Sequence, residues 1–293
     1  MRENVWIIIV NYKSYKDTAS YVTKLLDQEG VNLSIVIVDN DSGNNSFEIL
    51  TELFCSVPNV DVHQSGENLG YARGNNLGVI LSDIKNDDLV VISNNDLVVT
   101  EIDFFYRWSV LHRAMSNVGI TAPAMRVNGV LSSHMAWKIP TYSDSVKASI
   151  ATLEVILGDN KKYVFDNGSE TLMVDCVPGS LFMIEKQTLD LISNFDDGTF
   201  LYMEEVILSR KLKLVGKHNF LLRTIQYEHL VSKTISSELS SRNMRKYLVE
   251  SVIYYHRKYD RAGFFRVLLL QSLFKAWLLE NFIIRKVKGV IGK

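Results

Sequence analysis

Short apolar runs that each end in a cluster of polar residues are the feature that most constrains the fold of this chain. Three of them stand in the first hundred residues, at 5–10, 33–38 and 89–92. Runs of this length are typical of strands buried on both faces of a sheet. A short strand at 60–62 and helix-like segments fill the intervals, the helices at 17–26, 46–54 and 75–84. This alternation predicts an α/β fold with a mostly parallel, doubly wound central sheet flanked by helices.

The pattern changes in the second half of the chain. From about residue 128 to 168, Ser, Thr, Asn and Lys dominate, which predicts loops and an antiparallel edge. An apolar strand pattern returns at 173–184. Helices are expected at four further places, near 186–193, 204–214, 242–259 and 262–288.

Composition supports a folded chain with a buried core. Of the 293 residues, 47% are hydrophobic and 22% are charged, which argues against disorder. The net charge of −1 argues against a protein that coats nucleic acid. The two cysteines have no metal-ligand spacing, which suits a reducing, cytoplasmic compartment. We expect no secretory leader, and the sequence shows no run of about 18 apolar residues that would span a membrane.

The carboxylate after the second apolar run is suited to nucleobase recognition. Asp39 opens the sequence Asp-Asn-Asp-Ser at the end of that run. A carboxylate there can accept the ring N–H of uracil or thymine in a charge-assisted hydrogen bond. The alternative is that Asp39 and Asn40 cap the turn into the next helix.

Residues 68–76, Asn-Leu-Gly-Tyr-Ala-Arg-Gly-Asn-Asn, form a candidate diphosphate-binding loop. Two glycines bracket Arg73, and two asparagines, of which Asn75 is the first, open the expected helix. Backbone N–H groups at a helix N-terminus, together with an arginine, suit a diphosphate. A tight turn without a ligand would explain the glycines equally well. Neither a Walker loop nor a G-x-G-x-x-G fingerprint is present.

The third apolar run ends in Asn94-Asn95-Asp96. Ligands gather beyond the carboxyl ends of parallel strands, and a carboxylate there can hold a divalent cation that in turn holds a diphosphate. The alternative is a loop or helix cap. Gly179 interrupts the apolar pattern at 173–184, where it would let a ligand approach the backbone closely or mark a bulge.

Two further positions can carry chemistry. Glu204 and Glu205 follow the aromatic segment Phe-Leu-Tyr-Met, and one of them could serve as a general base for an incoming hydroxyl. Acidic pairs in the first turn of a helix also simply complement its dipole. His229 is a candidate ligand, although a lone histidine is more often packed or at the surface.

Taken in order, these motifs resemble those of the inverting family 2 glycosyltransferases of GT-A fold, in particular the rhamnosyltransferase-like members that build bacterial polysaccharides. The resemblance covers about residues 5–235. It rests on the following matches: Ile-Val-Asn-Tyr (9–12), Val-Asp-Asn-Asp-Ser (38–42), residues 68–76, Asn-Asn-Asp (94–96), Pro-Gly-Ser (178–180), Phe-Leu-Tyr-Met-Glu-Glu (200–205) and His229.

The resemblance implies a GT-A catalytic domain at 1–240, with a nucleotide-sugar half at about 1–100 and an acceptor half at about 101–240. A basic, amphipathic helical extension would follow at 241–293. The implied donor-binding residues are Asn11, Tyr12, Asp39, Asn68, Gly70, Arg73, Asn75, Asn95 and Gly179. Asp96 and His229 would hold Mg²⁺ or Mn²⁺, and Glu205, or else Glu204, would be the catalytic base.

The sequence departs from the family pattern at three positions. It has Asn94 where many members have an acidic residue, so the metal would depend on Asp96. It has Glu205 where the family usually has aspartate, and Ile207 where a further acidic residue is common.

The expected reaction is inverting transfer of a sugar from a nucleotide diphosphate donor, with dTDP-L-rhamnose favoured over a UDP-hexose. The acceptor would be a hydroxyl of a lipid-linked or growing bacterial surface polysaccharide such as O-antigen. One alternative is a sugar-nucleotide nucleotidyltransferase, although a glycine-rich basic loop is missing after the first strand. Another is a sugar-nucleotide-binding module without catalysis.

The C-terminal segment suggests a peripheral membrane contact. Residues 257–293 carry nine Lys and Arg against two acidic residues, mixed with Phe, Leu, Trp and Ile. A basic, aromatic-rich helix at 262–293 can lie on the anionic inner face of the cytoplasmic membrane. The alternative is a helix packed on the catalytic domain with a solvated basic face.

Overall fold

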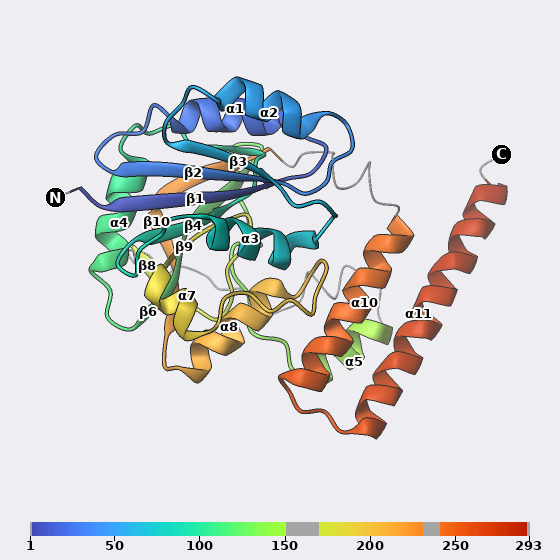
Figure 1. Ribbon diagram of the computed structural model, residues 1–293. Coiled ribbons are helices and arrows are strands. Elements are labelled where there is room, and N and C mark those ends of the chain that lie inside the picture. The colour runs from blue at the N-terminus through green and yellow to red at the C-terminus, as the bar shows by residue number, and fades with distance from the viewer. Residues whose placement is uncertain (1, 151–169, 231–240, 292–293) are drawn as a thin grey trace.

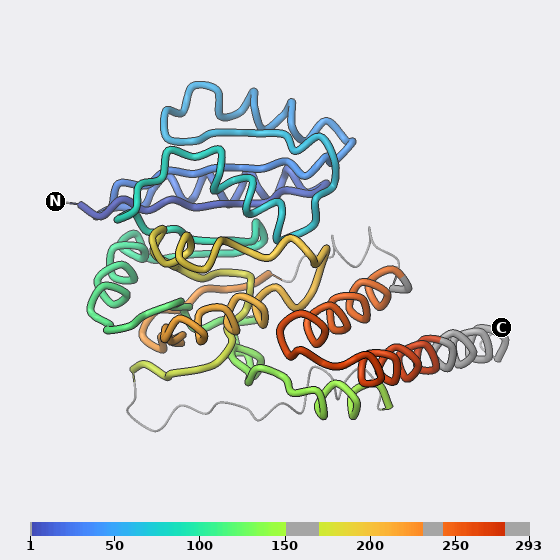
Figure 2. Tube along the Cα trace, turned by 60° about the horizontal axis from the view of Figure 1, so that its bottom comes forward, coloured from blue at the N-terminus to red at the C-terminus, as the bar shows by residue number. Residues whose placement is uncertain are grey.

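The computed structural model describes residues 2–150, 170–230 and 241–291, and within the last range the side chains of 243–278. A mixed ten-stranded sheet carries helices on both faces, and two long helices stand to one side of it (Figures 1 and 2). The strands of the main path follow the order β3-β2-β1-β4-β9-β6-β10-β5, with β7 beside β6 and β8 beside β10.

The strands are β1 (Asn4–Asn11), β2 (Asn32–Asp39), β3 (Val60–Gln64), β4 (Leu89–Ser93), β5 (Leu97–Val98), β6 (Val118–Val127), β7 (Val130–Leu131), β8 (Thr171–Val174), β9 (Leu181–Glu185) and β10 (His218–His229). The helices are α1 (Tyr15–Leu25), α2 (Ser46–Phe54), α3 (Gly70–Leu81), α4 (Phe104–Arg113), α5 (Tyr142–Ile150), α7 (Lys186–Leu191), α8 (Glu204–Leu214), α10 (Ser241–Lys258) and α11 (Phe264–Ile291).

Residues 1–100 have the expected parallel arrangement. β1 pairs in parallel with β2 and with β4, and β2 pairs in parallel with β3. The register sets Asn11 beside Asp39 at the carboxyl ends of β1 and β2. The polar clusters after these strands therefore meet at one edge of the sheet, as the sequence predicts.

The second half makes the sheet mixed. β9 lies between β4 and β6 and is antiparallel to both, whereas β10 is parallel to β6 and antiparallel to β5 and β8. The apolar pattern at 173–184 is thus two strands with different partners, and the interpretation of a break within one strand was wrong. The connecting loop at 175–180 contains Gly179, so it supplies the backbone beside the site.

Some of the other helices and loops predicted from the sequence are confirmed, and others were wrong. The helices at 46–54 and 204–214 are confirmed by α2 and α8. The expectation of loops from 128 to 168 was wrong for α5, whose apolar face packs on α11, although β7 supplies the antiparallel edge. Residues 151–169 lie outside the described residues. α4, β6 and β10 were not predicted from the sequence.

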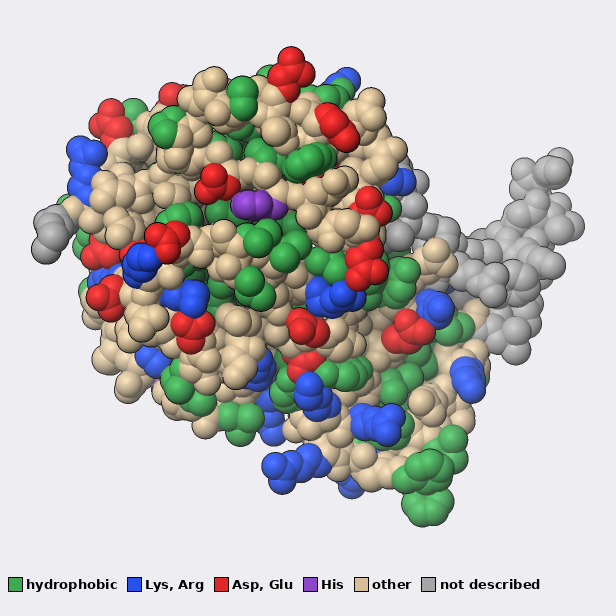
Figure 3. All heavy atoms as spheres, in the orientation of Figure 1, with side chains coloured by type: hydrophobic (Ala, Val, Ile, Leu, Met, Phe, Trp, Pro, Cys, Tyr) green, Lys and Arg blue, Asp and Glu red, His purple; other side chains and the backbone are tan. Residues whose placement is uncertain are grey.

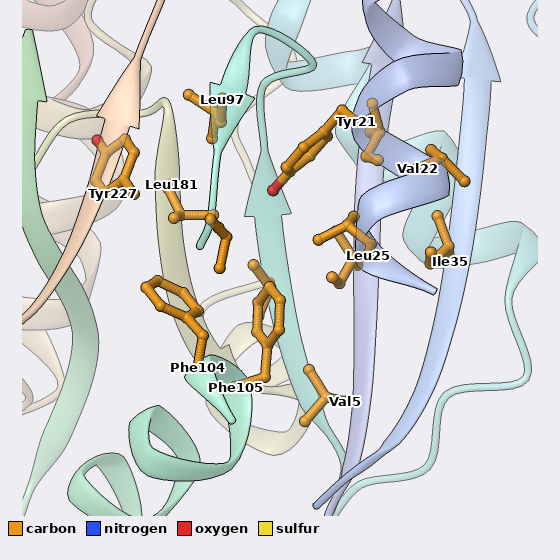
Figure 4. Close-up of a cluster of buried hydrophobic side chains, with 14 of the residues drawn as sticks. Val5, Tyr21, Val22, Leu25, Ile35, Leu97, Phe104, Phe105, Leu181 and Tyr227 are labelled. Atoms are coloured by element: carbon orange, nitrogen blue, oxygen red, sulfur yellow. The ribbon is translucent and has the colours of Figure 1, made fainter. Parts of the chain in front are cut away.

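Two hydrophobic layers fill the faces of the sheet. On one face, α1, α2 and α4 cover side chains such as Ile7 and Ile35 of β1 and β2. Figure 4 shows Tyr21 and Leu25 of α1 pointing into this layer, together with Phe104 and Phe105 of α4. On the other face, α3 and α8 cover the alternate residues of the same strands. Burial on both faces explains why the strands read as continuous apolar runs.

Glycines bring α3 close to the sheet. A Cβ on Gly78 would lie 2.5 Å from Ile8 Cγ2, and a Cβ on Gly74 would lie 3.1 Å from Val10 Cγ2. Only residues without a side chain allow this approach. The N-terminus of α3 is thereby held next to the carboxyl ends of β1 and β2.

The helical C-terminal extension is confirmed. α10 and α11 pack side by side, and α11 also packs on α5 (Figures 1 and 2). Their shared apolar cluster consists of Leu248, Val249, Val252, Leu270, Phe274 and Trp277. Within the described ranges, no helix has both the length and the apolar character needed to cross a bilayer.

Candidate active site

The carboxylate of Asp39 lies at the centre of a closed hydrogen-bond network. Asn11 Nδ2 and Ser42 Oγ both donate to Asp39 Oδ2 at 2.6 Å, and the backbone N–H of Ser42 donates to Oδ1 at 3.0 Å. Asp39 is only 1% exposed. The structure therefore contains the turn-capping contacts that the sequence offered as an alternative, and recognition of a nucleobase by this residue stays a prediction.

Residues around Tyr12 complete this corner of the site. Tyr12 is half-buried, and Lys13 Nζ lies 5.3 Å from the centroid of its ring. Lys13 adopts a φ of 58°, and its N–H donates to Ser42 Oγ at 2.8 Å. Ser42 therefore connects the ends of β1 and β2, a role that the sequence analysis did not assign to it.

Asn40 fastens the 68–70 loop to the end of β2. Its Nδ2 donates to Asn68 Oδ1 and to the carbonyl of Gly70, both at 3.1 Å, and its Oδ1 accepts from the N–H of Leu69 at 2.9 Å. Asn68 Oδ1 also accepts from the N–H of Gly70 at 3.1 Å. From the sequence, Asn40 was predicted only as a turn cap, so its contact with the 68–70 loop was not predicted.

The helix after this loop begins earlier than expected. α3 starts at Gly70, where φ is 76°, and the N–H of Tyr71 donates to the carbonyl of Phe200 at 3.0 Å. Asn75 therefore lies inside the helix, where its Nδ2 donates to the carbonyl of Tyr71. The prediction that the two asparagines open the helix was wrong, because Gly70 can adopt the left-handed conformation that starts it.

Arg73 points toward solvent in this conformation. Its Nη2 pairs with Glu67 Oε1 at 2.9 Å, and both side chains are largely exposed. Exposed ion pairs of this kind contribute little to stability, so Arg73 can leave Glu67 for another anionic partner at a small cost in free energy. Its contact with a diphosphate stays a prediction.

Asp96 and His229 are close together where β5 pairs with β10. His229 Nε2 lies 3.2 Å from Asp96 Oδ1, and the N–H of Leu230 donates to the carbonyl of Asp96 at 2.9 Å. The antiparallel pairing of β5 with β10, which sets Leu97 beside His229, causes the contact. The two residues predicted to share a metal are thus neighbours.

The donor atoms at this position suit Mg²⁺ or Mn²⁺ with an incomplete set of protein ligands. Carboxylate oxygen is a preferred ligand of both ions, and neutral imidazole nitrogen can additionally bind Mn²⁺ as a transition metal. Among the residues that the structure describes, no three His, Cys, Asp or Glu side chains form a metal-binding group. A cation held by Asp96 and His229 would leave coordination positions for diphosphate oxygens and water, as Mg²⁺ in phosphate sites usually does.

Asn95 links this turn to the ends of β1 and β2. Its Nδ2 donates to Ser14 Oγ and to Thr18 Oγ1, both at 2.7 Å. Thr18 Oγ1 donates in turn to Asn11 Oδ1 at 2.7 Å. A continuous polar chain therefore runs from the 94–96 turn to Asp39.

The two glutamates have different surroundings. Glu204 is buried, and burial together with the negative charge of Glu205 raises the pKa of Glu204 to about 8. Glu205 Oε1 accepts a hydrogen bond from the N–H of Gly179 at 3.2 Å, and burial raises the pKa of Glu205 also. Burial and the neighbouring charge therefore both favour the protonated form of Glu204.

Gly179 gives Glu205 its space. A Cβ on Gly179 would lie 2.6 Å from Glu205 Oε1 and 3.0 Å from the hydroxyl of Tyr71. That hydroxyl donates to the carbonyl of Gly179. The close approach expected at this glycine is made in the structure by Glu205 and Tyr71.

Ser180 connects the candidate base to the candidate metal site. Its carbonyl accepts from the N–H of Asn94 at 2.8 Å, and its hydroxyl lies 2.7 Å from the hydroxyl of Tyr227. Gly179 and Ser180 are consecutive, so one short backbone segment holds both Glu205 and the 94–96 turn. Tyr71, Ser180 and Tyr227 were not assigned roles from sequence, and only the first two lie within motifs that could have indicated them.

The chain is similar in sequence to known glycosyltransferases. The family model described as glycosyl transferase family 2 matches residues 6–105. Over 207 residues the chain is 27% identical to the low-salt glycan biosynthesis hexosyltransferase Agl10 of Haloferax volcanii; the alignment covers 70% of this chain and 60% of that protein. Over 273 residues it is 22% identical to the rhamnosyltransferase WbbL of Escherichia coli K12, covering 88% of this chain and 98% of that protein.

Solved structures show the same fold at low sequence identity. The mannosyltransferase PcManGT of Pyrobaculum calidifontis, in complex with GDP-Man and Mn²⁺, superposes with a TM-score of 0.60 at 13% identity, over 94% of this chain and 75% of that one. GalNAc-T7 with UDP, GalNAc and Mn²⁺ superposes with a TM-score of 0.61 at 12% identity, over 98% and 58%. The chain therefore shares the fold of these glycosyltransferase structures, and its residues 6–105 match the glycosyl transferase family 2 model.

Proposed function

We propose that this protein transfers a sugar, with inversion, from a nucleotide diphosphate donor to a hydroxyl group of a glycan. The observation that carries the proposal is the contact between Asp96 and His229 at the end of β4, which one backbone segment connects to Glu205. A metal–diphosphate site and a carboxylate base are the two elements that such a transfer requires. The ends of β1 and β2 supply the adjoining nucleotide corner.

In the proposed reaction, the acceptor oxygen attacks the anomeric carbon of the donor sugar. The bond from that carbon to the β-phosphate oxygen breaks, the nucleoside diphosphate leaves, and the acceptor proton passes to Glu205. The departing diphosphate would have part of its charge neutralised by a divalent cation. Asp96 and His229 would hold the cation, and the 68–70 loop would face the diphosphate.

Glu205 is a better candidate for the base than Glu204. A base must be ionised before it accepts a proton, and burial and the neighbouring charge both favour the protonated form of Glu204. The hydrogen bond from the N–H of Gly179 favours the ionised form of Glu205 and orients its carboxylate. Its raised pKa also makes the ionised carboxylate a stronger proton acceptor.

The donor that we favour is dTDP-L-rhamnose, with a UDP-hexose as the second choice. The similarity to the rhamnosyltransferase WbbL over most of its length supports rhamnose, and Asp39 would suit the ring N–H of either thymine or uracil. The test is a thermal-shift screen of sugar nucleotides with Mn²⁺. A larger shift with a guanine or adenine nucleotide than with dTDP or UDP sugars would contradict this choice.

A lipid-linked or growing surface polysaccharide such as O-antigen is the acceptor class that we infer. Transfer assays with and without EDTA separate this function from its alternatives. Metal-dependent release of nucleoside diphosphate with glycan formation is the expected result. Release of pyrophosphate from a sugar phosphate and a nucleoside triphosphate would favour a nucleotidyltransferase. Donor binding without any release would favour a non-catalytic binding module.

A peripheral contact with the cytoplasmic membrane belongs to the same proposal. At the start of α11 four large hydrophobic side chains are exposed: Phe264, Phe265, Leu268 and Leu269. Figure 3 shows hydrophobic side chains at the surface at the lower right of the molecule. Exposed arginines lie beside these four residues in the sequence, at 257, 261 and 266. Apolar side chains flanked by cations suit an anionic bilayer surface. The basic residues Arg285, Lys286, Lys288 and Lys293 lie outside the described side chains.

The membrane contact can be tested without removing the helix. We expect the wild-type protein to float with anionic vesicles, and the double variant Phe264→Ser/Phe265→Ser to float less. Both side chains are exposed, so the change leaves the α10–α11 packing in place. Equal flotation of the two proteins would show that this patch does not bind membranes.

A further inference from the structure

The segment from Phe195 to Met203, called here the 195–203 segment, leads directly into Glu204 and Glu205. On one side it is fastened to α3. Asn76 Nδ2 donates to the carbonyl of Phe195 at 3.0 Å and to Asp197 Oδ1 at 2.7 Å, and Asn76 Oδ1 accepts from the N–H of Phe195 at 3.0 Å. The segment is thus tied to the part of the molecule formed by residues 1–100.

On the other side, Asp196 ties the segment to α10 and to the residue that follows it. Tyr254 donates its hydroxyl to Asp196 Oδ1 at 2.6 Å, and Lys258 Nζ donates to Oδ2 at 2.7 Å. The hydroxyl of Tyr259 also donates to Oδ2. The Asp196 side chain is 6% exposed. Although burial opposes ionisation, hydrogen bonds from Lys258, Tyr254 and Tyr259 lower the pKa of Asp196 to about 2.

α10 also follows the segment beyond Asp196. A Cβ on Gly198 would overlap the ring of Tyr254. Further along, the ring centroids of Phe200 and Tyr247 lie 4.5 Å apart. Ser251 Oγ donates to the carbonyl of Leu201 at 2.9 Å. Successive turns of α10 therefore contact successive residues of the segment.

The segment ends in a backbone conformation that its surroundings must hold. Tyr202 and Met203 have φ angles of 74° and 71°, in the left-handed region that residues with a side chain rarely adopt. A strained backbone conformation of this kind persists only where the surrounding contacts hold it in place. Both side chains pack on the apolar cluster of α10 and α11, and Met203 also packs on a second cluster that includes Val206, Ile207 and Tyr255.

We propose that Asp196 is a positioning residue, and that through it α10 holds the 195–203 segment in the conformation that places Glu205 against Gly179. The inference rests on the proposed role of Glu205 in sugar transfer. It gives the C-terminal extension a part in catalysis that is separate from any contact with a membrane. Weakening the tie should relax the strained turn at Tyr202 and Met203 and let the carboxylate of Glu205 move.

The test compares Asp196→Asn and Asp196→Glu with a matched control, Asp190→Asn. Asp190 also pairs with a lysine, Lys186, but on the exposed face of α7. We expect Asp196→Asn to lower kcat on the order of 10–100-fold while leaving the donor Kd within about twofold, because small displacements of a reacting group are costly. Asp196→Glu should recover part of the loss, and Asp190→Asn should behave as the wild type.

Two readouts separate positioning from general destabilisation. The pH profile of kcat should shift in Asp196→Asn, because Glu205 would lose its fixed surroundings. Hydrogen exchange of the amides at 196–205 should become faster in this variant while exchange in β1 and β4 stays unchanged. If Asp196→Asn fails to fold, Tyr254→Phe makes the milder version of the same change, with the same expected directions.

The outcomes are decisive in each case. Unchanged kcat and pH profile in a folded Asp196→Asn, or unchanged exchange at 196–205, would overturn the inference even if sugar transfer is established. Failure of the wild-type protein to release nucleoside diphosphate from any donor would overturn the proposed function instead. Hydrogen exchange would still show in that case whether α10 holds the segment.

Discussion

The N–H of Gly179 donates to Glu205 Oε1 at 3.2 Å, and a Cβ on Gly179 would lie 2.6 Å from the same oxygen. The glycine therefore both orients the candidate base and leaves room for it. A side chain of any size at this position must displace the carboxylate or the loop, because real Cβ atoms do not approach so closely.

Gly179→Ala should consequently reduce turnover. We expect a fall in kcat on the order of 10²-fold, the cost of moving a reacting group by about 1 Å. Donor affinity measured by calorimetry should change little. Gly263→Ala is the matched control, since a Cβ there meets no atom within 4 Å. Full activity in Gly179→Ala would mean that Glu205 does not need this position.

Glu205→Gln should be the more damaging of the two glutamine substitutions. If proton transfer limits the rate, kcat should fall by about 10²–10⁴-fold. Glu204→Gln imitates the protonated form that the surroundings of Glu204 favour, so its loss should be smaller. Steady-state kinetics on both variants test this. Near-full turnover in Glu205→Gln would transfer the role of base to Glu204.

Glu204 should also make the stability of the protein depend on pH. Its pKa in the folded protein, about 8, lies above the ordinary value of 4.5, so the folded state retains a proton that the unfolded chain releases. Stability therefore falls as pH rises from about 4.5 to about 8, and falls no further from this cause above that range. Glu204→Gln removes the effect. Thermal melts should show the variant gaining on the wild type between pH 5 and pH 8.5, and parallel curves would contradict the raised pKa.

Asp96→Ala should remove metal-dependent donor use. We expect kcat/KM to fall on the order of 10²–10³-fold, the loss typical when one preorganised charge-stabilising group is removed. His229→Ala should act in the same direction, and the two losses should not add fully because the residues share one site. Calorimetry with UDP or dTDP, with and without Mn²⁺, gives the binding component. Asp61→Ala, an exposed carboxylate of β3, is the control.

Asn40→Asp should weaken the loop that precedes α3. The variant keeps an acceptor for the N–H of Leu69 but loses the donors to Asn68 and to the carbonyl of Gly70. A buried carbonyl without a partner costs about 1–3 kcal/mol. The melting temperature and the affinity for nucleoside diphosphate should therefore both decrease. An unchanged affinity would separate this loop from diphosphate binding.

Local patterns predicted the parts of this fold that depend on local physics. The continuous apolar runs revealed β1, β2 and β4 because both faces of these strands are buried. The start of α3 was misplaced because Gly70 begins the helix through a positive φ and a contact with Phe200, which is 130 residues away. Nothing near Gly70 in the sequence announces that partner.

In the candidate site, too, the individual residues were predicted from local sequence but the long-range contacts were not. Asp96 and His229 were selected as a pair, yet their contact depends on the antiparallel pairing of β5 with β10, and β10 was not foreseen. The hydrogen bonds to Asp196 from α10 and the residue that follows it were not predicted, because they join residues 58 to 63 positions apart in the sequence. Their Tyr, Lys and Asp side chains are also common on protein surfaces, so the residue types alone do not indicate a contact. Tertiary contacts of this kind leave no periodic signal in the sequence.

The insertion of β9 between β4 and β6 has a consequence for any attempt to isolate the part of the chain that carries the family motif. All five residues of β4 are buried, and one edge of the strand is paired only when Leu181–Glu185 is present. A fragment ending near residue 105 would expose that edge as a row of unpaired N–H and C=O groups on an apolar strand, which is a template for aggregation. During synthesis the same edge stays open until β9 (Leu181–Glu185) has left the ribosome, well after β4 (Leu89–Ser93), so we expect the nascent chain to be prone to aggregation over that interval.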